Sequence, residues 1–491
     1  MKKLILLLII TSLLLACGNN ENNTAKNTTP SQETTNTAEA AETRPPLDLP
    51  VTNYEGYQFR ILSVNSTVTG NGTHPGFNYY SDFTYVPERA GEPINDAIYY
   101  RNLRVNEDFN VEIINTEVAD VFAEARKIIA SGEDVYDIIT PYMENSFRLA
   151  EQKYLVNLFD VPYLNLKNPW WDQSLIENLS LNNKLYTITG EISMQDEDLN
   201  WCIIGNKVLM EEYQVPDLYS LVREGKWTLD RMYEIGTSVT HDLNGDGVIN
   251  WEDVYAFGES PTGCMFYYFA GGENIAVLDK DGYPQLTLGN ERALSVVDRI
   301  TEIFNDFNFI IWPENAKGAN GVSGWQYFRV MFKENRLMLF SASMYCVKEL
   351  RDMVDDFAIL PGPKYDEKQD TYYMIQSTHA CPGISIPITN SNLERTGILL
   401  EAIAYHSKSV QEAYYDITLT GKFTRDEESR DMLDIIFTNV TYDIGKAFGW
   451  GGYISQMTNA VNGKKGFAAL VEANKVKAET EIEKSFDLFL E

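Results

Sequence analysis

A loop at residues 242–253 has the residue types and the spacing of a calcium site. Oxygen donors stand at its first, third, fifth and twelfth positions, Gly247 allows a sharp turn at the sixth, and the seventh offers a backbone carbonyl. These ligand positions are Asp242, Asn244, Asp246, Val248 and Asp253. The spacing predicts a structural Ca²⁺ ion, although the twelfth position is usually the longer Glu. The alternative is an Asn-Gly/Asp-Gly turn without metal.

Catalytic signatures do not occur in the sequence. The four histidines are isolated from one another, and there is no G-x-S-x-G, H-E-x-x-H or P-loop motif. A glycoside hydrolase needs two carboxylates about 5–9.5 Å apart across a cleft. Because the chain has 71 acidic residues, such a pair stays open as an alternative. We expect a protein that is not an enzyme.

The N-terminus has the parts of an export signal in the expected order. Two lysines precede an apolar stretch at residues 4–15, which is shorter than the roughly 20 apolar residues that span a bilayer. The stretch ends in Ala16-Cys17 and resembles the bacterial lipobox. We therefore expect residues 1–17 to be a lipoprotein signal peptide, with a lipid on Cys17. The alternative is an ordinary secretory signal with a Cys near its end.

The segment after Cys17 is polar. Asn, Thr, Glu, Ala and Pro dominate it, and no large apolar residue occurs before Leu47. Such a segment buries too little apolar surface to offset its chain entropy, so residues 18–50 are predicted to be a disordered tether.

The composition of the whole chain limits its partners. With 40 basic and 71 acidic residues, the formal charge is −31, which argues against nucleic acid and anionic lipid as partners. The 29 tyrosines suit a protein that stacks on flat, hydroxyl-rich ligands, although a Tyr-rich core is the alternative. Four cysteines remain after Cys17 and match no zinc spacing, so we expect buried thiols. They are Cys202, Cys264, Cys346 and Cys381.

The first part of the body alternates strand and helix patterns. Strand patterns lie at residues 57–64, 111–114 and 135–140, with helical patterns between them. This alternation predicts a parallel sheet with right-handed crossovers, and ligands bind such sheets beyond the carboxyl ends of the strands. Tyr142 therefore falls at a binding edge; the alternative is a surface loop tyrosine.

A second αβ unit begins near residue 200. Strand patterns occur at residues 201–205 and 337–341, and Thr228 is a good N-cap for a helix that follows it. From about residue 393 the sequence is mainly helical in pattern.

The order of these segments resembles the family 1 extracellular solute-binding proteins of ABC transporters, in the sugar-binding branch that includes maltose-binding protein. The resemblance spans residues from about 55 to 490. The stretches that carry it are D-V-Y-D-I-I at 134–139, Y-T-I-T-G-E at 186–191, G-K-W-T-L-D at 225–230, Y-A-F-G at 255–258, F-K-E-N-R-L-M-L at 332–339 and N-A-V-N-G-K-K-G-F-A-A-L at 459–470. Extra residues around 65–90 and 145–185 depart from typical members.

The resemblance implies an α/β, two-lobed periplasmic-binding-protein (Venus flytrap) fold, in which each lobe is a mostly parallel sheet flanked by helices. Lobe 1 is expected at residues 51–190 and 336–390, and lobe 2 at residues 191–335 and 391–491. The strand near 332–339 is expected to return the chain to lobe 1. Because the ligand contacts both lobes only when they close, it favours the closed form through a hinge motion.

Sugar sites combine aromatic platforms with groups that accept hydroxyl hydrogens. Glu191 matches the crossover glutamate that contacts sugar in the maltose branch. Trp450 stands where that branch places a stacking aromatic, and Tyr345 follows the return strand, where the family places an aromatic near the cleft. Together with Tyr142 these are the expected ligand residues. The alternatives are a solvated turn acid for Glu191 and a core anchor for Trp450.

Two further pairs of residues are expected to have roles other than ligand binding. The pair Trp170-Trp171 is expected to pack in the interior. Asp196 and Asp198 are expected to lie in a solvated acidic loop; the alternative is that they accept hydrogen bonds from ligand hydroxyl groups.

The sequence thus predicts a monomeric, lipid-anchored protein at the extracellular face of the bacterial cytoplasmic membrane. It would capture an oligosaccharide between its lobes and deliver it to the permease subunits of an ABC transporter. A secreted glycoside hydrolase and a ligand-sensing lipoprotein without transport are the alternatives.

Overall fold

The computed structural model describes residues 44–64, 81–316, 324–350, 353–415, 427–463 and 465–490. The predicted signal peptide at residues 1–17, its lipidated Cys17 and residues 18–43 of the predicted tether lie outside the described residues. The account below therefore concerns the body of the chain.

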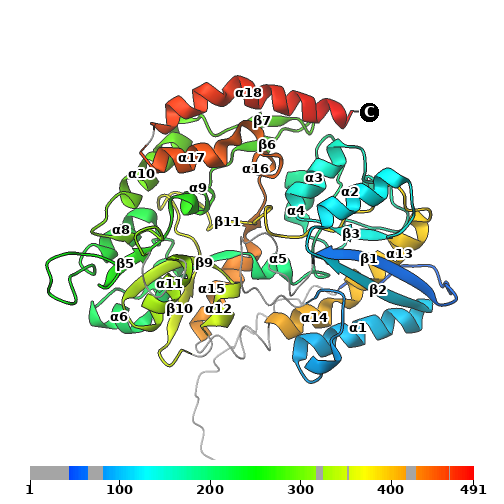
Figure 1. Ribbon diagram of the computed structural model, residues 1–491, viewed down its shortest axis with the longest axis horizontal. Coiled ribbons are helices and arrows are strands. Elements are labelled where there is room, and N and C mark those ends of the chain that lie inside the picture. Colours follow the sequence, from blue (N-terminus) through cyan, green and yellow to red (C-terminus); the bar gives the residue numbers. More distant parts are fainter. Residues whose placement is uncertain are drawn as a thin grey trace, which may run out of the picture. The chain divides into compact units, whose positions relative to one another are not determined.

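A parallel sheet of three strands forms in the first part of the body. Its order is β2-β1-β3, with β1 (Tyr57–Val64) between β2 (Val111–Val118) and β3 (Ile138–Thr140). The helices α1 (Pro93–Phe109) and α2 (Val121–Ser131) lie on opposite faces of this sheet (Figure 1). The strands and helices predicted for this region are confirmed.

Local sequence places the end of β3 beside the next helix. Pro141 follows β3 directly and donates no backbone N–H, so it does not extend the ladder. The helix α3 (Met143–Glu151) starts two residues later, after Tyr142. Glu144 therefore stands in the first turn of α3, at the carboxyl end of the sheet.

The second sheet has five strands in the order β10-β4-β9-β5-β8. It is mixed, because β4 runs antiparallel to both β10 and β9, whereas β5 runs parallel to both β9 and β8. The strands are β4 (Trp201–Asn206), β5 (Tyr255–Gly258), β8 (Ile310–Ile311), β9 (Leu337–Ser343) and β10 (Phe357–Leu360).

Helices surround the second sheet. Thr228 caps α8 as predicted, since its side chain accepts a hydrogen bond from the Arg231 backbone N–H. The helices are α6 (Lys207–Glu212), α7 (Leu218–Arg223), α8 (Leu229–Gly236), α9 (Cys264–Ala270), α10 (Glu291–Phe304), α11 (Gly324–Lys333), α12 (Tyr345–Glu349) and α15 (Glu427–Thr438).

Two parts of the expected chain path are wrong. The strand β9 does not return to the first sheet, because it pairs with β4 and β5 of the second. The helix α13 (Leu393–His406), expected in lobe 2, packs on α1 beside the first sheet. Both are strongly apolar segments, and an apolar pattern reports burial without naming the sheet that covers it. The expected boundaries at residues 335 and 390 therefore do not follow the two sheets, and the boundary at residue 190 stays a prediction.

The remaining elements connect the two sheets or lie near the C-terminus. Two-stranded ladders join β6 to β7 and β11 to β12. These elements are β6 (Ala276–Leu278), β7 (Pro284–Leu286), β11 (Met374–Ile375), β12 (Val440–Thr441), α4 (Gln173–Leu179), α5 (Gln195–Asp198), α14 (Lys408–Glu412), α16 (Ile444–Phe448), α17 (Tyr453–Val461) and α18 (Phe467–Leu488), with short 3₁₀ turns at η2 (Pro87–Arg89), η3 (Leu158–Asp160), η4 (Pro261–Gly263) and η6 (Trp450–Gly452).

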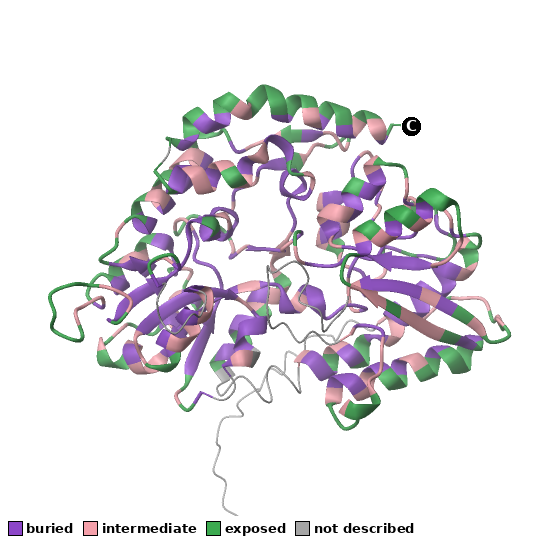
Figure 2. Cartoon of the chain, viewed as in Figure 1, coloured by how far each residue is buried: buried purple, intermediate pink, exposed green. Residues whose placement is uncertain are grey.

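Burial follows these layers. The strands of the two larger sheets are mostly buried except for the edge strand β2, whereas α18 and the outer side of α1 are largely exposed (Figure 2). The four cysteines of the body are free, buried thiols, as predicted. In the part of the chain that the structure describes, no helix combines the length and the apolar character that crossing a membrane requires.

Candidate functional site

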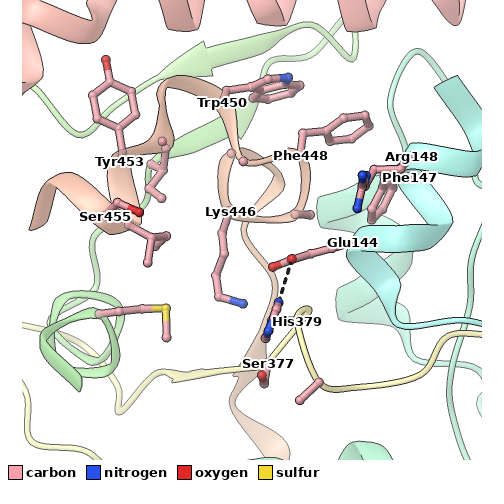
Figure 3. Close-up of a pocket in the computed structure, with 18 of the residues that line it drawn as sticks. Glu144, Phe147, Arg148, Ser377, His379, Lys446, Phe448, Trp450, Tyr453 and Ser455 are labelled. Atoms are coloured by element: carbon pink, nitrogen blue, oxygen red, sulfur yellow. Dashed lines mark hydrogen bonds and ion pairs between the residues drawn. The ribbon is translucent and has the colours of Figure 1, made fainter. Parts of the chain in front are cut away.

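We call a cavity of about 530 Å³ the first cavity. Its lining residues come from segments next to both of the larger sheets. Residues of α3 contribute from the side of the first sheet. Trp201 at the start of β4 and Ser343 at the end of β9 contribute from the second sheet. The segment 445–455, which runs from α16 into α17, completes the wall (Figure 3).

Charged side chains meet in this cavity. Glu144 reaches in from α3 and Lys446 from α16, with His379 beside them (Figure 3). The Glu144 carboxylate lies 3.1 Å from His379 Nδ1 and accepts a hydrogen bond from Thr378 Oγ1. The hydrogen bond with Glu144 raises the pKa of His379. This pair joins the first turn of α3 to the connecting segment 376–381.

Lys446 is the most deeply buried charge of the first cavity, with 5% of its surface exposed. Its Nζ donates to the Gln376 carbonyl oxygen at 3.1 Å and to Thr378 Oγ1 at 2.8 Å. Burial lowers the pKa of Lys446 to about 8, although the nearby Glu144 and Asp443 carboxylates oppose that change. The lysine therefore carries a positive charge at neutral pH in a poorly solvated place.

Aromatic rings form the apolar part of the first cavity. Phe448 and Trp450 stack with ring centroids 4.8 Å apart and planes 15° apart. The positive φ angle of Gly449, between these two residues, allows the tight turn that brings their rings together. Phe448 is half-buried, whereas Trp450 is only 2% exposed. Phe448 also packs against Phe147, with ring centroids 4.6 Å apart, so part of its ring remains for a ligand, and Trp201 is likewise half-buried.

Hydrogen bonds fix the indole N–H edge of Trp450. Its indole Nε1 donates to Ser485 Oγ at 3.1 Å, and Ser485 Oγ donates to the Glu151 carboxylate at 2.8 Å. This chain of bonds links η6 to α18 and α3. It fixes the orientation of the indole in the cavity wall and occupies the Glu151 carboxylate.

A second cavity of about 460 Å³ is lined by acids and aromatic rings. Its carboxylates include Glu191, Asp196 and Glu197, and its rings include Trp171 and Tyr414. Burial, and after it the neighbouring Asp172, raises the pKa of Glu197 to about 8. Burial also raises the pKa of Asp196 well above its usual range, and Glu197 adds to the effect. Burial therefore favours the protonated, neutral forms of Asp196 and Glu197.

A buried carboxylate organises the tryptophans beside the second cavity. Trp170 and Trp171 are each 1% exposed, so they pack as expected. Their indole N–H groups donate to the two oxygens of Glu401 at 3.1 and 3.0 Å. The Asn168 side chain and the Asn165 backbone N–H donate to the same carboxylate. Glu401 thereby ties α13 to the segment 165–171.

The structure separates the four expected ligand residues. Trp450 lines the first cavity and Glu191 the second. Tyr142 and Tyr345, both among the described residues, line neither of these two cavities. Tyr142 is half-buried directly before α3, and Tyr345 is buried at the start of α12.

The expectation of a solvated loop at Asp196 and Asp198 is wrong. Both side chains are buried in α5. Thr189 Oγ1 donates to Asp196 at 2.8 Å, and the Tyr414 hydroxyl donates to Asp198 at 2.7 Å. The partner of Asp198 lies 216 residues further along the chain, and a local sequence pattern does not reveal such a contact.

Several residues of the first cavity were missed from the sequence. For two of them a signal exists: Glu144 stands just beyond the third strand, at the predicted binding edge, and Phe448 is two residues before Trp450. Trp201, His379 and Lys446 carry no local signal, because only the packed chain brings them to one cavity.

The predicted calcium loop is curled by its own side chains. The Asp242 carboxylate accepts the Gly245 and Gly247 backbone N–H groups at 2.6 and 2.7 Å, and these bonds lower the pKa of Asp242. Asp253 accepts the backbone N–H groups of Leu243 and Asn250. Among the described residues, no three His, Cys, Asp or Glu side chains gather as a metal centre. The donors are of the right kind, but their carboxylates do not converge on one point.

Solved structures establish the type of fold. A family 1 extracellular solute-binding protein from Bifidobacterium longum subsp. infantis superposes with a TM-score of 0.56 at 15% identity, over 87% of this chain and 99% of that one. The chain has the fold of the family 1 extracellular solute-binding proteins. Two further proteins with this fold bind named sugars. The cyclic alpha-maltosyl-1,6-maltose binding protein of Arthrobacter globiformis gives a TM-score of 0.55 at 11% identity, over 87% of this chain and 99% of that one.

An ABC substrate-binding protein from Listeria monocytogenes, in complex with cycloalternan, gives a TM-score of 0.53 at 12% identity, again over 87% and 99% of the two chains. No family model matches the sequence, and no curated protein does. The likeness to solute-binding proteins therefore lies in the fold. The expected two-domain α/β class is confirmed, with a mixed second sheet.

Proposed function

We propose that this chain captures an oligosaccharide outside the cell for import by an ABC transporter. The observation that carries the proposal is the first cavity, where the half-buried rings of Trp201 and Phe448 stand beside the polar groups of Glu144 and Lys446. A sugar offers an apolar ring face and a rim of hydroxyl groups, so it needs this combination. Proteins of the same fold that bind sugars support it.

The place of the first cavity suits a binding protein that changes shape. Residues near both larger sheets line it, so a ligand there would contact both parts of the body. A ligand stabilises whichever conformation gives it more contacts. We propose that oligosaccharide binding favours a closed form through movement of the connecting segments near residues 191–200 and 376–381.

Anchoring and delivery complete the proposal. A lipid on Cys17 and a polar tether at residues 18–50 would hold the body at the extracellular face of the bacterial cytoplasmic membrane. A monomer there would pass its ligand to the permease subunits. The charge of −31 leaves the lipid as the only membrane contact and disfavours nucleic acid as a partner.

A panel of neutral and acidic oligosaccharides tests this proposal. Thermal shift finds the glycans that stabilise the protein, and calorimetry measures their affinities. Chromatography of the same mixtures after long incubation separates capture from hydrolysis. We expect saturable binding of at least one glycan and its recovery intact. Release of shorter sugars would support the secreted hydrolase instead, and binding of peptides or metal ions with no glycan would contradict sugar capture.

We also propose that the loop at residues 242–253 binds a structural Ca²⁺ ion through Asp242, Asn244, Asp246, Val248 and Asp253. The support is the kind and spacing of the oxygen donors and the curled backbone that the loop already has. Convergence of the carboxylates would have to accompany binding, because bound Ca²⁺ is held by several oxygens at once.

A further inference from the structure

A buried ammonium group faces the first cavity with only uncharged partners. The two hydrogen bonds of Lys446 Nζ go to a backbone carbonyl and to a threonine hydroxyl. Lys446 takes part in none of the ion pairs between described residues. An ammonium group has three donor protons, so one remains for a ligand. Such a charge is costly to bury unless a counter-charge completes its surroundings.

The nearby carboxylates bond to groups other than Lys446 Nζ. Glu144 holds His379 and Thr378, and Glu151 accepts from Ser485. Asp443 caps α16, where its oxygens accept the backbone N–H groups of Lys446 and Ile275. These acids lower the cost of the buried charge at a distance, but none pairs with Nζ directly.

We infer that the first cavity takes an acidic sugar, whose carboxylate pairs with Lys446 Nζ. This inference rests on the proposed sugar capture and names the class of sugar. A uronate carboxylate supplies at once the missing counter-charge and an acceptor for the remaining proton. The rest of the ring keeps the features of any sugar: a face for Trp201 or Phe448 and hydroxyl groups for Glu144.

A second cation adds to this preference. Arg148 also lines the first cavity and is exposed, with its guanidinium over the Phe122 ring and a hydrogen bond to Asn145. The chain as a whole is strongly negative, whereas the two cations here balance the Glu144 and Glu151 carboxylates that line the same cavity. An acidic ligand would therefore meet less repulsion at this place than the net charge of the chain implies.

The test uses pairs of oligosaccharides that differ only in the carboxylate. Galacturonate, mannuronate and glucuronate oligomers are each compared with their carboxyl-reduced counterparts, in which the acid becomes a hydroxymethyl group. Calorimetry is performed on the full chain in detergent. We expect at least one acidic oligomer to bind about tenfold or more tightly than its reduced form, as a charge-assisted bond requires.

Variants assign the difference to one side chain. Lys446→Met should remove the preference, lowering acidic affinity about tenfold or more while the reduced form changes little. Lys408→Met is the matched control, because Lys408 is an exposed lysine of the second cavity. If Lys446→Met does not fold, as judged by melting without ligand, the salt dependence of the wild-type protein replaces it. Added salt should weaken the acidic oligomer and leave the reduced one unchanged.

Two results would overturn the inference. Equal affinity for acidic and reduced forms, or equal losses of both in Lys446→Met, would leave sugar capture standing and remove the acidic preference. The absence of binding to every acidic and neutral glycan would instead overturn the proposed function itself.

Discussion

The two cavities are similar in size and differ in charge. The first, of about 530 Å³, has Arg148, His379 and Lys446 on its walls beside the two carboxylates Glu144 and Glu151. The second, of about 460 Å³, has five carboxylates and one lysine, which are Asp172, Glu191, Asp196, Glu197, Glu412 and Lys408. In the second, buried groups such as Asp196 and the two tryptophans bond to other parts of the protein. In the first, Lys446 keeps a donor that the protein does not use. The volume of a cavity alone therefore does not distinguish a ligand site from a cavity whose lining side chains already bond to other parts of the protein.

The largest expected effect lies beside the second cavity. Glu401→Ala removes the acceptor of two buried indole N–H groups, an amide side chain and a backbone N–H. Leaving these donors unsatisfied should lower the free energy of unfolding by about 3 kcal/mol or more. Urea denaturation measures this change. Glu412→Ala, at an exposed acid of the same cavity, should change it by less than about 0.5 kcal/mol. Equal stabilities of the two variants would contradict the role given to Glu401.

The next prediction concerns calcium binding in a region outside both cavities. If the loop at 242–253 binds the ion, Ca²⁺ at about one hundred times its dissociation constant should stabilise the protein by about 2.7 kcal/mol. A melting experiment with Ca²⁺ or with a chelator checks this, and Asp242→Ala should abolish the difference. Glycan affinity should be the same in both conditions. No change in melting on adding Ca²⁺ would remove the ion from the account.

A smaller effect should separate the aromatic residues of the cavities. Trp201→Ala removes a ring offered to the ligand in the first cavity, and we expect the glycan affinity to fall about tenfold. Tyr415→Ala, at a half-buried ring of the second cavity, should leave it unchanged. Calorimetry with one glycan and both variants gives the comparison. A loss of glycan affinity in Tyr415→Ala alone would instead place the glycan in the second cavity.

The smallest predicted effect is a pH dependence. The pKa of Lys446 is lowered to about 8, so the free protein loses this charge as the pH rises through that value. An anionic ligand favours the charged form, so affinity for an acidic glycan should be full below pH 8 and fall by up to about tenfold per unit above it. Asp443, with a pKa raised to about 6, and His379 hydrogen-bonded to Glu144 also face this region. In Lys446→Met the affinity for an acidic glycan should no longer fall as the pH rises above about 8. If the pH dependence is unchanged in this variant, another group causes it.

The sequence predicted most of the elements and little of the site. Strands β1 to β3, the cap at Thr228 and the buried cysteines follow from local patterns and composition. The place of β9 does not, because an apolar strand fits the centre of either sheet. Glu144 lies more than 200 residues before both His379 and Lys446 in the sequence, and a single sequence has no periodic signal for such contacts.

A matched pair of isosteric variants tests the central claim most directly. Glu144→Gln changes the first cavity and Glu191→Gln the second, each by one charge and almost no volume. Calorimetry with the tightest carboxyl-reduced glycan of the panel should show a loss of about tenfold in Glu144→Gln and none in Glu191→Gln. The reverse result, a loss confined to Glu191→Gln, would contradict the assignment and place the sugar in the second cavity.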